Sequence, residues 1–330
     1  MTGLRAAVVG VGYLGRFHAQ KYATLPGVEL AAVVDLDPER AATVAAELGV
    51  PACTRVEELP AGVSIASVVV PTREHFAVAR ALLEAGVNVL VEKPITATVA
   101  EARELIALAT TCGRVLQVGH LERFNPVVRA LAERVDTPLF IEAHRVSPFR
   151  LRGADANVVL DLMIHDIDLI AEFVRAPVER IDASGVAVLS HDIDIANARI
   201  QFRGGCVANV TASRASLKHE RRLRLFQPTA YFSVDLADHR LDIRRKAHTD
   251  MYPGVPDIET EMLEFPTGDA LRAEIEAFVA SVRDGRPPTV NGTDGLRALT
   301  IATEIVAQLQ RQAPPRTAAS SQPGSRERNP

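Results

Sequence analysis

The chain has 330 residues, more than the ~250 at which a single hydrophobic core usually stops growing, so two domains are expected. Hydrophobic residues make up 47% and charged residues 24% of it, which excludes a fibrous class and general disorder. The formal net charge of −4 excludes a global basic field for nucleic acid or an anionic membrane, so any anion site has to be local.

The number of cysteines and the length of the apolar runs indicate in which cellular compartment the protein is expected. Cys53, Cys112 and Cys206 are odd in number and far apart, which fits neither a disulfide framework nor a C-x-x-C metal site. We therefore expect reduced thiols and no bound metal. No apolar run approaches the ~20 residues that span a bilayer, and the apolar start runs into a glycine motif rather than a cleavage site. The sequence predicts a cytoplasmic protein without a membrane partner.

Up to about residue 120, short β-branched runs alternate with alanine-rich helical stretches, which is typical of a parallel sheet covered on both faces. A glycine follows each predicted helix, where positive φ is often needed. We expect an α/β, Rossmann-type NAD-binding domain over residues 1–122. Its predicted strands and helices are Leu4–Val9, Leu14–Leu25, Val28–Asp35, Asp37–Leu48, Ile65–Val70, Arg73–Ala85, Asn88–Glu92, Val99–Thr110 and Val115–Val118.

Beyond Asn125-Pro126 the apolar period falls from helical spacing to two, which predicts an α+β domain with a large, mostly antiparallel open sheet. We expect this substrate-binding and oligomerisation domain over residues 123–312, with its last helices packed back on the first domain, and a disordered tail over 313–330. Its predicted elements are Val127–Arg134, Leu139–Val146, Val158–Val174, Ile181–Leu189, Ile195–Phe202, Cys206–Ser213, Arg222–Phe226, Tyr231–Leu236, Leu241–Arg245, Leu271–Arg283 and Thr293–Gln310.

Residues 10–15 read GVGYLG and fit G-x-G-x-x-G between a predicted strand and a predicted helix. Gly10 permits the tight turn, Gly12 lets the backbone approach a pyrophosphate, and Gly15 permits close helix–strand packing. Asp35 ends the second strand, where a carboxylate accepts from both ribose hydroxyls and repels a 2′-phosphate, so NAD is predicted over NADP. A tight packing turn with an ordinary strand-end aspartate is the alternative.

Two further patterns carry acid–base chemistry. Lys93 follows an apolar strand at the carboxyl edge of the predicted sheet, where ligands bind; a surface lysine is the alternative. The apolar helix beyond residue 158 carries one polar stripe, which faces either solvent or a cavity. A histidine one turn from a carboxylate has its charged form supported, and suits proton transfer at neutral pH. The stripe consists of Asp161, His165, Asp168 and Glu172, with Asp166 off it.

The motifs together resemble the glucose–fructose oxidoreductase/inositol dehydrogenase (Gfo/Idh/MocA) family. They are the glycine loop with His18, PTREH at 71–75, EKP at 92–94, and Asp161 four residues before His165. The resemblance implies that Lys93, Asp161 and His165 are catalytic. Val70 departs from the family, which often has Thr there. The expected cofactor-binding residues are Gly10, Gly12, Tyr13, Leu14, Gly15, Asp35, Pro71, Thr72, His75, Glu92 and Lys93.

Residues 119–126, 144–149, 159–166 and 194–199 are similar to one branch of that family, the UDP-N-acetylglucosamine 3-dehydrogenases of 3-amino-sugar lipid A synthesis. This similarity implies oxidation of the sugar 3-hydroxyl by NAD, with an aminotransferase partner. Cations at His144 and over residues 214–224 could hold a diphosphate, or could be charged edge strands that prevent aggregation. The expected substrate-binding residues are His120, Arg123, Asn125, Arg145, Asp161 and His165.

In the expected mechanism His165 removes the hydroxyl proton, Asp161 supports its cationic form, and Lys93 donates to the developing oxyanion. The roles of Lys93 and His165 are interchangeable at this stage. His75 either lines the cofactor crevice or caps a turn, and His18 is expected to pack. Another sugar, an inositol or another nucleotide sugar remains an alternative substrate, and a non-catalytic NAD-binding sensor or scaffold an alternative function. We also expect a homodimer or homotetramer and no nucleic-acid partner.

Overall fold

The computed structural model describes residues 3–149 and 157–312, so the tail predicted at 313–330 lies outside the described part. The first half forms a parallel sheet of six strands in the order β3-β2-β1-β4-β5-β6. Its elements are β1 (Leu4–Val9), α1 (Tyr13–Thr24), β2 (Val28–Val34), α2 (Pro38–Leu48), β3 (Ala52–Cys53), η1 (Val56–Glu58), β4 (Ile65–Val68), α3 (Thr72–Glu84), β5 (Asn88–Glu92), α4 (Val99–Thr111) and β6 (Leu116–Gly119).

The second half forms a sheet of eight strands in the order β14-β13-β12-β11-β7-β10-β9-β8, antiparallel except where β7 meets β10. Its elements are η2 (Leu121–Phe124), α5 (Pro126–Ala132), β7 (Phe140–Val146), η3 (Val159–Met163), α6 (Ile164–Val174), β8 (Val178–Val186), β9 (Ile195–Phe202), β10 (Val207–Ser213), β11 (Glu220–Gln227), β12 (Ala230–Asp235), β13 (Arg240–Tyr252), β14 (Val255–Glu264), α7 (Ala270–Asp284) and α8 (Gly292–Gln312).

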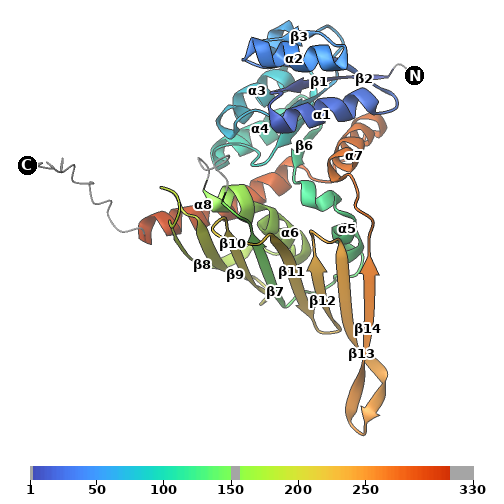
Figure 1. Cartoon of the computed structure of the whole chain (residues 1–330), viewed down its shortest axis with the longest axis vertical. Coiled ribbons are helices and arrows are strands. Elements are labelled where there is room, and N and C mark those ends of the chain that lie inside the picture. The colour runs from blue at the N-terminus through green and yellow to red at the C-terminus, as the bar shows by residue number, and fades with distance from the viewer. Residues whose placement is uncertain (1–2, 150–156, 313–330) are drawn as a thin grey trace, which may run out of the picture.

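Two cores cover the faces of the parallel sheet, and a third lies under the second sheet. Buried side chains of α1, α2 and α7 pack on one face of the first sheet, and those of α3, α4 and α8 on the other. The second sheet packs on α5, α6 and α8, while no helix of the described residues covers its other face (Figure 1). The doubly wound first half and the antiparallel second half confirm the predicted fold class.

The last two helices join the halves. α7 lies beside α1 of the first half, and α8 contacts both α4 and α6 (Figure 1). Gly292 and Gly295 of α8 allow this approach, because a Cβ at either position would come within 3 Å of a side chain of the first half. The two C-terminal helices thus pack against elements of the first half. No helix in the described ranges is long and apolar enough to cross a membrane.

The structure corrects the predicted elements in four places. The short strand β3 was not predicted, and β13 extends to Tyr252 rather than ending at Arg245. β14 was also not predicted; it is the edge strand of the second sheet, a position that tolerates a proline such as Pro256. The helix predicted at Val158–Val174 begins with a π-turn, η3, before α6. Such interruptions often mark functional sites.

Candidate active site

The glycine loop between β1 and α1 has the shape that a dinucleotide phosphate needs. Gly10 has a φ of 84°, and a Cβ there would lie 2.5 Å from the Val69 carbonyl oxygen. A Cβ on Gly15 would overlap the Gly10 carbonyl oxygen, so glycine is required for α1 to start this close to β1. By contrast, a Cβ on Gly12 would meet nothing within 4 Å. The Gly12 backbone therefore borders open space, and the loop fits a dinucleotide cofactor.

Asp35 lies just after β2, and the glycine loop holds its carboxylate in place. Asp35 Oδ2 accepts from the Val11 N–H at 2.9 Å, and Oδ1 accepts from the Asp37 N–H at 3.0 Å. Arg40, in the first turn of α2, pairs with Asp35 at 3.1 Å and with Asp37 at 3.0 Å. Arg40 was not among the predicted site residues. Its guanidinium neutralises part of the charge beside the expected ribose position.

Lys93 follows β5 and reaches the helical segment of the second half. Its Nζ donates to the Asp161 carbonyl oxygen at 2.7 Å and lies 3.6 Å from the Asp161 carboxylate. The carbonyl belongs to the π-turn η3. Burial lowers the pKa of the Lys93 ammonium, and the carboxylates of Asp161 and Glu92 only partly oppose this effect. Lys93 and Asp161 thus bring the two halves together at one point.

His165 lies one turn after Asp161, and both side chains line the same cavity. Burial lowers the pKa of His165 well below its ordinary value, and the charges of Lys93 and Arg145 lower it further. The expectation that Asp161 supports the charged form of His165 is wrong, because the Asp161 carboxylate pairs with Lys93 and cations dominate the surroundings of the imidazole. His165 is therefore neutral at pH 7 and able to accept a proton.

The cavity has a volume of about 300 Å³ and lies against the second sheet. Arg145 on β7 and Arg221 on β11 stand directly opposite each other in the antiparallel pair and both line it. Like charges in this position repel. Glu122 of η2 compensates, since its Oε1 lies 2.8 Å from Arg145 Nη1 and 3.7 Å from Arg221 Nη1. Arg145 is buried, while the Arg221 side chain is 53% exposed, so Arg221 remains accessible to an anion.

Strand alternation divides the predicted cation cluster between two faces. Arg221 faces the cavity, whereas Arg222 lies on the open face of the sheet, 3.7 Å from Asp235. Arg224, two residues later, is likewise outside the cavity and approaches Glu142. Each of the two predictions for the cluster thus holds for some of its residues. Arg221 lines a cavity, whereas Arg222 and Arg224 pair with carboxylates on neighbouring exposed strands.

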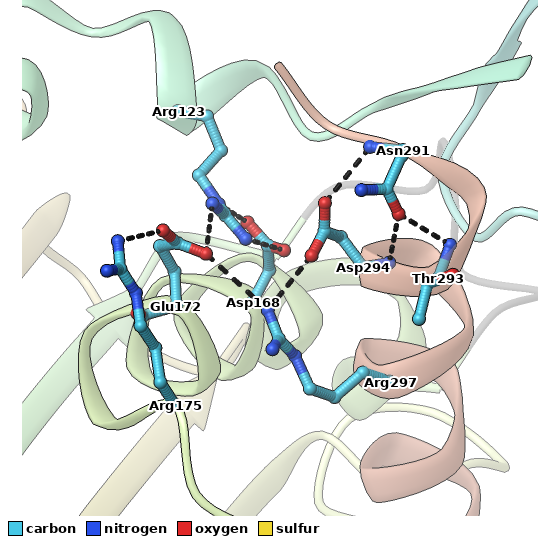
Figure 2. A network of polar contacts seen from close by, with 8 residues as sticks. All are labelled: Arg123, Asp168, Glu172, Arg175, Asn291, Thr293, Asp294 and Arg297. Atoms are coloured by element: carbon cyan, nitrogen blue, oxygen red, sulfur yellow. Dashed lines mark hydrogen bonds and ion pairs between the residues drawn. The ribbon is translucent and has the colours of Figure 1, made fainter. Parts of the chain in front are cut away.

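The polar stripe on the η3–α6 segment also divides. Its first half, Asp161 and His165, lines the cavity, whereas Asp168 and Glu172 bind Arg123 (Figure 2). Arg123 is buried and donates to Asp168 at 2.6 and 2.9 Å. Figure 2 shows that the network continues through Arg297 to α8. Arg123, expected among the substrate-binding residues, therefore lies in an internal network rather than on the cavity wall.

Other expected site residues also have internal partners. Asn125 caps α5, its Oδ1 accepting from the Val127 N–H at 3.2 Å. His75 is buried, with its two ring nitrogens 2.8 and 2.9 Å from the carbonyl oxygens of Pro94 and Val70. It thus joins the β4–α3 loop to the segment that carries Lys93. Tyr13 and Leu14 are exposed beside the glycine loop.

Two buried groups next to the cavity stand out. Both ring nitrogens of His120 are buried without a hydrogen-bond partner, and burial lowers its pKa. Asp166 makes a bidentate pair with Arg145, at 2.8 and 2.9 Å. Asp166 lies off the predicted polar stripe, and Glu122 was not among the predicted site residues. Neither position carries a distinct sequence signal, because Glu122 is followed by Arg123 and Asp166 is preceded by His165.

The comparisons with known proteins agree with this geometry. Residues 4–120 match the family model of an oxidoreductase family with an NAD-binding Rossmann fold, and residues 134–231 match the GFO/IDH/MocA C-terminal domain. The chain is 41% identical to UDP-N-acetylglucosamine 3-dehydrogenase from Acidithiobacillus ferrooxidans, over 92% of this chain and 97% of the relative. It is 27% identical to scyllo-inositol 2-dehydrogenase (NAD(+)) from Bacillus subtilis, over 88% and 90%.

Solved structures are similar over nearly the whole chain. A structure of the Acidithiobacillus ferrooxidans UDP-N-acetylglucosamine 3-dehydrogenase matches with a TM-score of 0.88 and 39% identity, covering 94% of this chain and 99% of that one. Scyllo-inositol dehydrogenase from Lactobacillus casei, with NAD(H) and scyllo-inositol bound, matches with a TM-score of 0.79 and 19% identity, covering 94% and 97%. The second likeness concerns the fold alone.

Proposed function

Because the chain belongs to the GFO/IDH/MocA family of NAD-binding oxidoreductases, we propose that it oxidises a sugar hydroxyl with NAD, specifically the 3-hydroxyl of UDP-N-acetylglucosamine. The observation that carries the proposal is the contact of Lys93 with Asp161, a residue that lines one cavity together with His165. The similarity to UDP-N-acetylglucosamine 3-dehydrogenase over nearly the whole chain supports this substrate.

Each of the three side chains has a distinct part in the proposed reaction. Bound NAD supplies the nicotinamide carbon that accepts the hydride. Neutral His165 accepts the hydroxyl proton, and Lys93 donates a hydrogen bond to the oxygen as negative charge develops. Asp161 holds the ammonium through its carbonyl oxygen and its carboxylate. Burial also lowers the pKa of Lys93, so the reverse assignment, with Lys93 as proton acceptor, is the second version of the mechanism.

A nucleotide sugar needs cations for its diphosphate. We assign this part to Arg221, which is exposed on the cavity wall, with support from the charge of Arg145 opposite it, whose guanidinium is held by Glu122 and Asp166. Within the internal network Arg123 supports η2 and α6, which carry Glu122 and His165. His120 and Asn125 flank the same η2 segment; His120 stays a proposed substrate contact, whereas Asn125 positions the segment by capping α5.

We propose NAD rather than NADP as the cofactor. The Asp35 carboxylate accepts hydrogen bonds from the backbone of the glycine loop, and this orientation suits ribose hydroxyls and repels a 2′-phosphate. The proposed cofactor contacts are those expected from the sequence: Gly10, Gly12, Tyr13, Leu14, Gly15, Asp35, Pro71, Thr72, His75, Glu92 and Lys93. Binding of NADH and NADPH, followed by nicotinamide fluorescence, tests the preference.

The assembly and the cellular setting are also proposals. The helix-free face of the second sheet and the long β13–β14 hairpin, with Met251, Tyr252, Ile258 and Met262 exposed, support a homodimer or homotetramer. Sedimentation as a monomer would exclude it. We retain a cytoplasmic location, an aminotransferase partner for the ketone, and the domain ranges 1–122 and 123–312 as predictions.

The decisive experiment is incubation with NAD and a panel of UDP-N-acetylglucosamine, other nucleotide sugars, free sugars and inositols. Mass spectrometry reads the product, and a coupled sugar aminotransferase removes a ketone that does not accumulate. Loss of two hydrogens from UDP-N-acetylglucosamine is the expected result. Turnover of an inositol instead would retain the enzyme class and change the substrate. Cofactor binding with no turnover on the whole panel would favour the non-catalytic sensor.

A further inference from the structure

Helix α7 carries a carboxyl group in the protein interior. Glu274 shares the buried face of α7 with Ile275 and Phe278 and is 0% exposed. Both its carboxylate oxygens are buried without a hydrogen-bond partner. Gln117 Nε2 donates to the Glu274 backbone oxygen at 3.1 Å, which holds this turn of α7 against β6. An ionised carboxylate in this position would be strongly unfavourable.

Two titratable groups lie close to the Glu274 carboxyl group. The ligand atoms of His18, Glu92 and Glu274 all lie within 4.8 Å of one another. His18 connects the group to the sheet, with Nε2 3.2 Å from Glu92 Oε1 and Nδ1 3.1 Å from Ser67 Oγ. Ser67 Oγ also lies 3.0 Å from the Tyr22 hydroxyl. We refer to His18, Glu92 and Glu274 as the buried cluster.

The elements packed around Glu274 contribute few other charges. From α1 come His18 and Tyr22, and from the end of β5 come Glu92 and Lys93. The nearby side chains of β4 and β6 are the uncharged Ser67 and Gln117. From η2, Glu122 pairs with Arg145, and Arg123 pairs with Asp168 and Glu172. On α7, Arg272 and Glu276 pair with each other at the surface, and Asp269 pairs with Lys21 of α1.

The two carboxyl groups of the buried cluster differ in their hydrogen-bond donors. Burial would raise the pKa of Glu92, but His18 and Lys93 outweigh it, and the pKa falls below its ordinary value. Glu92 Oε2 accepts from the Lys93 backbone N–H at 3.2 Å. Glu274 has no such donor, so burial and the charge of Glu92 raise its pKa well above the ordinary value. One proton shared by this pair therefore resides on Glu274.

We propose that Glu274 is a positioning residue of the active site, a neutral carboxylic acid that limits the charge behind Lys93 to the single carboxylate of Glu92. It acts through Glu92, whose carboxylate holds the backbone of Lys93. The inference rests on the proposed function only in taking Lys93 as an active-site group. Because a second charge would repel Glu92, the neutral form allows α7 to close over the buried cluster.

The charge state is testable without substrate or cofactor. Unfolded Glu274 ionises above its ordinary pKa of 4.5, whereas in the folded protein it stays protonated. The folded state then binds more protons, so this group's contribution to stability is complete below pH 4.5 and is lost as pH rises through the raised pKa. Glu274→Gln removes the titration. The Tm of this variant should exceed that of the wild type by a margin that grows from pH 5 to pH 9.

Glu276→Gln is the matched control, because Glu276 lies on the exposed face of the same helix and pairs with Arg272. Its Tm should follow that of the wild type across the pH range. Parallel curves for the wild type and Glu274→Gln would overturn the proposal. In infrared difference spectra, Glu274→Gln should lose a protonated-carboxyl band that Glu276→Gln retains.

The positioning role needs an activity readout. At neutral pH, Glu274→Gln should keep turnover within twofold of the wild type, because glutamine has the size and charge of the protonated acid. At alkaline pH, ionisation of Glu274 in the wild type should repel Glu92 and reduce turnover, and the variant should stay active to higher pH. An unchanged alkaline limb would contradict the role. Failure of the proposed function is distinguishable from failure of this inference. If Lys93 were not catalytic, Lys93→Ala would stay active, but the Tm difference between the wild type and Glu274→Gln would be unchanged.

A cation is the alternative partner for the same carboxyl pair. Zn²⁺ or Mg²⁺ titrated into the chelated protein should leave its Tm and that of Glu274→Gln equally unchanged. A rise in the wild-type Tm that Glu274→Gln abolishes would overturn the neutral acid in favour of a metal site.

Discussion

Glu92 and Lys93 are consecutive residues whose side chains enter two different environments. Lys93 meets Asp161 beside an accessible cavity, where each charge has a partner or reaches solvent. Glu92 meets His18 and Glu274 in the buried cluster, where one carboxyl group has no partner. Both sites combine a histidine with carboxyl groups. Access to solvent and the presence of an opposite charge, rather than residue type, therefore distinguish the proposed reactive side chains from the proposed positioning side chains.

Removal of either reactive group on the cavity side should have the largest effect. Lys93→Ala or His165→Ala should lower turnover by about 10²–10⁴-fold, because positioned proton transfer and oxyanion stabilisation are lost. NADH binding, followed by fluorescence, should persist in both variants. Lys246→Ala, on the exposed β13, is the control and should retain full turnover. Near-normal turnover in both active-site variants would place the chemistry elsewhere.

Two adjacent arginines of β11 separate the cavity from the open face. Arg221→Ala should raise KM for the nucleotide sugar by about 10–100-fold, since a charged hydrogen bond contributes roughly 1.5–3 kcal/mol. Arg222→Ala should leave KM unchanged, because Arg222 approaches Asp235 outside the cavity. Steady-state kinetics at fixed ionic strength compares the two. If the two substitutions changed KM equally, Arg221 would not be part of the proposed diphosphate site.

A change beside the buried cluster should affect stability rather than catalysis. The Ser67 hydroxyl lies within hydrogen-bond distance of both His18 and Tyr22. Ser67→Ala should lower the free energy of unfolding by about 1–2 kcal/mol, because it leaves buried polar groups without a partner. Denaturant unfolding measures the loss, and turnover per folded molecule should stay within twofold. Ser190→Ala would not be a matched control for the Ser67 hydroxyl, because Ser190 bonds to Asp194 in a separate loop.

The pH dependence should show the smallest change and assigns the proton acceptor. Catalysis needs neutral His165, and its lowered pKa places protonation well below the ordinary 6.5. The logarithm of kcat/KM should therefore change little between pH 7.5 and 6.5 and fall only at lower pH, as the imidazole gains a proton. An acid limb with its midpoint above 6.5 would instead point to Lys93 as the group that must lose a proton.

Much of the cofactor side was predictable because its signals are local. The glycine loop, Asp35 and Lys93 each stand at the end of a strand whose apolar run is visible in the sequence. The substrate side was less predictable from the sequence. Arg123 and Asn125 follow a strand in sequence, yet their partners come from α6 and from the end of β12. Strand β14 was missed because its exposed face and its proline conceal the period of two.

The sequence by itself determined the parallel and antiparallel halves, the dinucleotide loop and the family, since periodicity, turns and motif spacing depend on neighbours along the chain. Only the tertiary structure decided the charge states. Asp161 pairs with Lys93 rather than supporting His165, and Glu274 joins Glu92 from a helix near the other end of the chain. The reason is physical: electrostatic interactions and desolvation depend on distance and burial in space, which separation along the chain does not specify.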